Sequence, residues 1–153
     1  MISRASFASP LGQITVTEED GAIAALRWGD AGVSADPTPL LHEAGQQLTA
    51  YFDNRLTRFD LPMSFPASPF LHGVIEAMLA IRHGETITYG DIAGYVQGSA
   101  QAVGNACGAN PIPILIPCHR VLGANSLGGF SGHGGVESKV FLLRLEGAAG
   151  LLI

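Results

Sequence analysis

The spacing of apolar residues changes along the chain, and this change limits the fold more than any other feature. Residues 2–8 and 13–18 alternate as strands do, and a third strand is expected at Ile23–Trp28. Residues 39–53 then place apolar side chains at helical spacing, and this helical period dominates after residue 66. The pattern predicts an α+β fold, with a small N-terminal antiparallel sheet and helix followed by a helical C-terminal part.

Prolines mark the point at which the pattern changes. Pro62, Pro66 and Pro69 interrupt any regular element there, because proline lacks a backbone N–H group. A short strand at Arg58–Leu61 is expected just before them. We therefore predict two domains, an N-terminal scaffold lobe of residues 1–66 and a C-terminal lobe of residues 67–153.

The composition restricts the class of protein. Of 153 residues 47% are apolar and only 14% are charged, which indicates a folded globular chain. No apolar run approaches the roughly 20 residues that cross a bilayer, and the first residues lack a signal-peptide core. We expect a cytoplasmic protein without membrane attachment, monomeric by default. The net charge of −5 means that any nucleic-acid surface is a local patch, with Arg82, Lys139 and Arg144 as candidates.

Two short helices are predicted in the C-terminal lobe. Thr88 can cap the first, with Asp91 completing a capping box, and Ser99 can cap the second, at residues 100–108. The second helix carries mostly alanine and glycine, so its backbone can approach another surface closely. That surface can be DNA or a neighbouring helix. The pair is compatible with a helix-turn-helix, although helical hairpins of this size more often serve only packing.

A cysteine lies where its chemistry can be tuned. The apolar run Ile112–Ile116 is bracketed by prolines and is followed by Cys118, His119 and Arg120. A neighbouring base or cation lowers the pKa of a thiol and makes it a nucleophile. Adjacent residues of an extended chain point to opposite sides, so the backbone must turn before Cys118 and His119 can cooperate. An inert buried cysteine beside an ordinary histidine is the alternative.

The last helix, at about Val136–Glu146, ends on a carboxylate that the apolar pattern directs inward. Glu146 follows Leu143 by three residues and so shares its face of the helix. A carboxylate in the last turn opposes the helix dipole, so a buried Glu146 needs a partner. If it is buried, Glu146, His119 and Cys118 follow the logic of a nucleophilic triad. A frayed, solvated helix end is the alternative.

No metal or cofactor is expected. The cysteines Cys107 and Cys118 and the histidines do not have the spacing of zinc ligands, and the glycine-rich loop at residues 128–135 has no phosphate-binding pattern. Two cysteines also cannot form the disulfide framework of a secreted domain.

The segment Asn110–Val121 resembles the active-site signature of the O6-alkylguanine-DNA alkyltransferases, the methylated-DNA–protein-cysteine methyltransferases. The resemblance continues through residues 84–93, 102–104, 134–136 and 143–147. It implies DNA repair by irreversible transfer of an alkyl group, such as methyl, from O6 of guanine in duplex DNA to Cys118. Each molecule would act once, without a cofactor, after the damaged base has been flipped out of the helix.

The resemblance also implies roles for single residues. Cys118 would accept the alkyl group, His119 would act on it as a base through a bridging water, Glu146 would orient His119, and Asn110 would hold the turn before the active-site segment. Tyr89 would contact the flipped guanine. The remaining contacts to the base would come from the loop around Ser131 and from the backbone of Val121.

The alanine- and glycine-rich helix would be the recognition helix, which in this family enters the minor groove. It contains Gln101, Ala102 and Gly104, and Gln101 stands where the family commonly has arginine. An alternative from another class is a non-catalytic alkyltransferase-like sensor of lesions, but such proteins replace the cysteine. A cysteine hydrolase that uses Cys118 and His119 is a third possibility.

Overall fold

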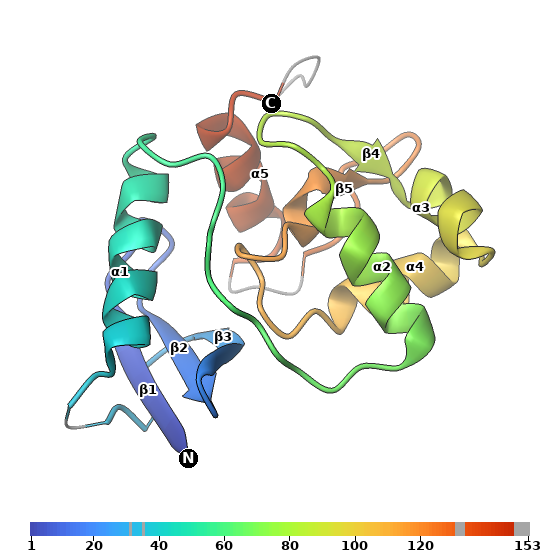
Figure 1. The fold of residues 1–153 in the computed structure, drawn as a ribbon. Coiled ribbons are helices and arrows are strands. Elements are labelled where there is room, and N and C mark those ends of the chain that lie inside the picture. Colours follow the sequence, from blue (N-terminus) through green and yellow to red (C-terminus); the bar gives the residue numbers. More distant parts are fainter. Residues whose placement is uncertain (31, 35, 131–133, 149–153) are drawn as a thin grey trace. The chain divides into compact units, whose positions relative to one another are not determined.

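The computed structural model describes residues 1–30, 32–34, 36–130 and 134–148 (Figure 1). The chain separates into two compact units, Met1–Pro66 and Ala67–Ile153. Together they contain sheets and helices in separate stretches of sequence, so the predicted α+β class is confirmed.

The first unit is a three-stranded antiparallel sheet with one helix. The strands are β1 (Ile2–Phe7), β2 (Ile14–Glu19) and β3 (Ala22–Trp28), in the order β1-β2-β3. The helix α1 (Pro39–Phe52) is capped by the hydroxyl of Thr38, which accepts a hydrogen bond from the backbone N–H of Leu41. The three predicted strands and the predicted helix are therefore confirmed.

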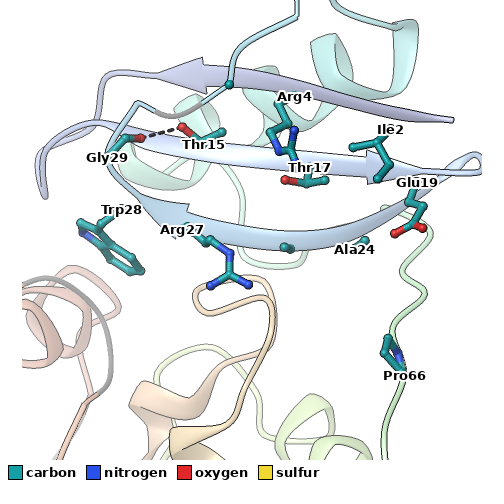
Figure 2. Close-up of a pocket in the computed structure, with 12 residues that line it drawn as sticks. Ile2, Arg4, Thr15, Thr17, Glu19, Ala24, Arg27, Trp28, Gly29 and Pro66 are labelled. Carbon is teal, nitrogen blue, oxygen red and sulfur yellow. Dashed lines mark hydrogen bonds between the residues drawn. The ribbon is translucent and has the colours of Figure 1, made fainter.

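The two faces of this sheet differ in chemistry. Ala5, Val16 and Leu26 lie opposite one another and are buried. Alternate residues of a strand point to opposite faces, so Arg4 and Thr17 project from the other face. That face carries a hollow of about 600 Å³, whose lining also includes Arg27 and Trp28 (Figure 2).

The strand expected at Arg58–Leu61 does not form. The chain instead touches β3 slightly later, where Met63 forms an isolated parallel bridge with Ile23. The N–H of Ile23 donates to the carbonyl of Pro62 at 2.8 Å, and Ser64 donates back at 2.9 Å. Pro62 has no N–H group to give a neighbouring strand, so proline limits this pairing.

The second unit is mainly helical. It contains α2 (Pro69–Leu79), α3 (Tyr89–Val96), α4 (Ala100–Gly108) and α5 (Val136–Leu145). Two short strands, β4 (Ile87–Thr88) and β5 (Val121–Leu122), pair in parallel. Helices α3 and α4 pack against each other and against α2 (Figure 1). Among the residues described, no helix is long and apolar enough to cross a membrane.

The predicted pair of short helices is present with the predicted caps. Thr88 and Asp91 form a reciprocal capping box at the start of α3, with both hydrogen bonds at 3.0 Å. Helix α3 ends on Gln97 in the left-handed conformation, and the hydroxyl of Ser99 caps α4. These caps fix the sharp turn that a helix-turn-helix requires.

Candidate active site

A buried turn places the cysteine. The apolar segment before it is not a strand but a tight turn, in which Ile114 takes a left-handed φ of 76°. The amide of Asn110 spans this turn. Its Nδ2 donates to the carbonyl of Ile116 at 2.9 Å, and its Oδ1 accepts from the N–H of Ile112 at 3.0 Å. Asn110 therefore fixes the segment that leads into Cys118.

Cys118, His119 and Arg120 form a single 3₁₀ turn, and all three are buried. The backbone thus turns between the thiol and the imidazole, as their cooperation requires. Burial raises the pKa of the Cys118 thiol, while the side chain of Asn110 and the charge of Lys139 act in the opposite direction. The thiol is therefore protonated at rest and needs a base.

Glu146 binds His119 and Arg120, the two residues that follow the cysteine. It lies just after α5, and its side chain is fully buried. Arg120 donates hydrogen bonds to both carboxylate oxygens of Glu146, from Nε to Oε1 at 2.8 Å and from Nη2 to Oε2 at 2.9 Å. The Nε2 atom of His119 lies 2.8 Å from Oε2. Burial raises the pKa of Glu146, but the hydrogen bonds from His119 and Arg120 outweigh it and hold that pKa well below its usual range. Glu146 is therefore an ionised acceptor.

This arrangement decides the state of His119. Burial lowers the pKa of His119 more than Glu146 raises it, so the imidazole is neutral at pH 7. An ionised carboxylate only accepts hydrogen bonds, so the proton of His119 lies on Nε2. The buried Nδ1 then carries a lone pair, and no described residue donates a hydrogen bond to it. His119 can accept a proton, and Glu146 stabilises the imidazolium that results.

A pocket of about 480 Å³ opens beside Cys118. The other residues that line it come from three elements. Helix α4 contributes Gln101, Gly104, Cys107 and Gly108, the start of α3 contributes Tyr89, and the loop after β5 contributes Gly129 and Phe130. The structure thus brings four of the sequence-derived site residues to one cavity. Ala102 is half-buried on α4 and Val121 is fully buried in β5, and neither lines the pocket. Ser131 lies outside the described residues.

Lys139 does not lie on the surface where its charge predicted it. We expected this side chain in a basic surface patch with Arg82 and Arg144, but it is completely buried, whereas the two arginines are exposed. Its Nζ donates to the carbonyls of Val121 at 2.6 Å and Gly129 at 3.1 Å. Lys139 precedes Leu143 by four residues, so the apolar stripe of the last helix already placed it inward. Burial lowers the pKa of Lys139 to about 8.

Metal ligands do not cluster in the part of the chain that the structure describes. No group of three or more histidine, cysteine, aspartate or glutamate side chains there could hold an ion. Cys107 lies on the pocket wall, and burial raises the pKa of its thiol to about 12. Of the two cysteines, only Cys118 directly precedes the histidine and arginine that bind Glu146.

Comparison with known proteins gives consistent matches. Residues 69–148 match the family model of the 6-O-methylguanine DNA methyltransferase DNA-binding domain, and residues 2–65 match that of its ribonuclease-like domain. A methylated-DNA–protein-cysteine methyltransferase of Mycolicibacterium paratuberculosis is 39% identical over 156 residues, covering 95% of this chain and 93% of the relative. The constitutive enzyme of Bacillus subtilis is 39% identical over 151 residues, covering 90% and 91%. The crystal structure of Mycobacterium tuberculosis OGT in complex with DNA has a TM-score of 0.84 and 38% identity, covering 95% of this chain and 92% of that one.

Proposed function

Because this chain belongs to the 6-O-methylguanine DNA methyltransferase family, we propose that it repairs duplex DNA by moving an alkyl group from O6 of guanine to its own Cys118. The observation that carries this proposal is the buried cysteine at a pocket, followed by a neutral histidine that an ionised glutamate holds in place. The transferring lobe is residues 67–153, and residues 1–66 serve as its scaffold.

The transfer is a displacement at the alkyl carbon. The thiol proton of Cys118 passes to His119 through a bridging water, and the sulfur attacks the carbon attached to O6. The sulfur–carbon bond forms as the carbon–oxygen bond breaks, and the electron pair of that bond stays with the guanine, which takes up a proton. The thioether has no route back to a thiolate, so each molecule reacts once and needs no cofactor.

The neighbours of Cys118 supply what a buried thiol lacks. A protonated thiol is a weak nucleophile, so the rate depends on a base that is neutral before the reaction and stable once charged. Neutral His119 meets the first condition, and the fixed carboxylate of Glu146 meets the second. Arg120 keeps Glu146 ionised and in place through two hydrogen bonds. Asn110 holds the turn that carries the thiol.

The damaged base reaches this pocket only after it leaves the stack. Helix α4 enters the minor groove, where the small side chains of Ala102 and Gly104 permit close backbone approach. Gln101, exposed at the pocket rim, contacts the base left unpaired, and Tyr89 contacts the flipped guanine. The backbone carbonyl of Val121 accepts a hydrogen bond from the exocyclic amine of the guanine. The loop around Ser131 presents a hydrogen-bond donor to O6. The protein acts as a monomer in the cytoplasm.

Intact-protein mass spectrometry tests the proposal. The protein is incubated with excess duplex that carries O6-methylguanine, and peptide mapping then locates the added methyl group. We expect one methyl group on Cys118, the same single methyl group in Cys107→Ala, and none in Cys118→Ala. Lesion binding without any mass change would contradict the proposal and favour a non-catalytic sensor. A methyl group on Cys107 would contradict the assignment of the acceptor.

A further inference from the structure

The one lysine of this chain is buried beside the pocket. We infer that Lys139 is a positioning residue for the transfer reaction, because its ammonium holds the Gly129–Phe130 wall of the pocket against β5 and Tyr89. The inference rests on the proposed function, since it concerns the geometry of the same pocket. It assigns a task to a group that neither accepts the alkyl group nor joins the His119–Glu146 pair.

Packing does not explain a lysine at this place. Lys139 is the only lysine among 153 residues, and its side chain is 0% exposed. Burying an ammonium is costly unless hydrogen bonds compensate for its lost hydration. No carboxylate in the described ranges lies within ion-pair distance of it, and its hydrogen-bond partners are backbone carbonyls. A methionine would fill similar space without that cost, so the hydrogen bonds are the reason for the charge.

Those hydrogen bonds close a loop. The carbonyl of Val121 belongs to β5, three residues after Cys118, and the carbonyl of Gly129 lies within the loop that follows. Nζ joins both, at 2.6 Å and 3.1 Å, from the facing helix α5. One side chain thereby links β5, the loop and α5, and its removal leaves a buried carbonyl without a donor.

Tyr89 contacts the same loop. Lys139 Nζ lies 5.7 Å from the centroid of the Tyr89 ring, within the range of a cation–π contact. Gly128 has a φ of 74°, and a Cβ built on it would lie 2.5 Å from the Tyr89 hydroxyl. The loop therefore rests directly on Tyr89, and Tyr89, Gly129 and Phe130 line the same pocket as Cys118.

A pair of substitutions at Lys139 tests the inference through the rate of transfer. Lys139→Met removes the donors and keeps an apolar stem, whereas Lys139→Arg keeps charge and donors. We expect Lys139→Met to slow methyl transfer about 100-fold, the cost of a misplacement of about 1 Å. Affinity for undamaged duplex should be unchanged, and Lys139→Arg should recover part of the rate. A wild-type rate in folded Lys139→Met would overturn the inference.

A second substitution keeps the test decisive if Lys139→Met does not fold. Gly128→Ala pushes the same wall away from Tyr89 and leaves Lys139 intact, so it should slow transfer while DNA affinity stays unchanged. The Gly129 amide hydrogen should also exchange faster in this variant. Wild-type transfer by Gly128→Ala would show that the wall position does not matter and would refute the inference. Absence of transfer in the unsubstituted protein would instead refute the proposed function.

Discussion

Replacing Glu146 by glutamine should destabilise the protein far more than any surface carboxylate does. Glu146 accepts hydrogen bonds from His119 and from two nitrogens of Arg120, and its side chain is fully buried. Glutamine leaves the guanidinium buried without a counter-charge and turns an N–H donor toward it. Removing one partner of a buried ion pair costs about 3–5 kcal/mol. We expect a loss of that size in the free energy of unfolding at pH 7.

The matched control lies on the same helix. Glu137 is exposed in the first turn of α5, where a carboxylate contributes about 0.3–1 kcal/mol through the helix dipole. Urea unfolding followed by far-ultraviolet circular dichroism gives both free energies. A loss in Glu146→Gln no larger than that in Glu137→Gln would refute the role assigned to the buried carboxylate.

The difference in unfolding free energy between wild type and Glu146→Gln should also depend on pH. The folded pKa of Glu146 lies below its unfolded value of about 4.3, so the unfolded chain binds that proton more tightly. The stabilisation by Glu146 is complete above about pH 5 and falls as the pH drops toward the folded pKa. The gap between wild type and Glu146→Gln should therefore narrow below about pH 4. His119, whose pKa is lowered, already costs stability below about pH 6.5. A gap that stays constant down to the acid transition would contradict this assignment.

Three other substitutions test the turn, the DNA surface and the scaffold. Asn110→Ala leaves the buried N–H of Ile112 without its acceptor and should cost about 1–3 kcal/mol in urea unfolding. It should also slow iodoacetamide labelling of the active thiol at neutral pH, since Asn110 lowers the thiol pKa. Gln101→Arg adds a cation at the pocket rim, so fluorescence anisotropy should show tighter DNA binding and a salt dependence steeper by about one unit of log–log slope. Gly45→Ala places a Cβ 2.3 Å from a ring carbon of Phe7 and should lower stability by about 1–3 kcal/mol, with unchanged urea unfolding as the contrary result.

Local sequence signals predicted most of the fold. Turns, caps and apolar periods are short-range features, so Ser99 and the Thr88–Asp91 capping box were readable without any tertiary information. The expected strand at Arg58–Leu61 failed because its pairing depends on where β3 lies, and the chain meets β3 at Met63 instead. Secondary structure that depends on a distant partner is less visible in a sequence.

The site shows the same division between local and long-range information. The inward direction of Glu146 followed from its helical stripe, and the structure buries it against His119. Lys139 lies on that stripe too, but its charge led us to expect it at the surface, because an isolated lysine is seldom buried. Only the carbonyls of Val121 and Gly129, which come from another part of the chain, make its burial possible.

The claim that each molecule transfers one alkyl group to Cys118 is tested most directly by the stoichiometry of repair with DNA in excess. A fixed amount of protein is mixed with increasing amounts of duplex that carries O6-methylguanine, and restored guanine is counted beside the methyl groups on Cys118. We predict one guanine restored per protein molecule, an equal number of methylated Cys118 residues, and no further repair when fresh duplex is added. Continued repair beyond the amount of protein would contradict the account, because a thioether at Cys118 cannot turn over.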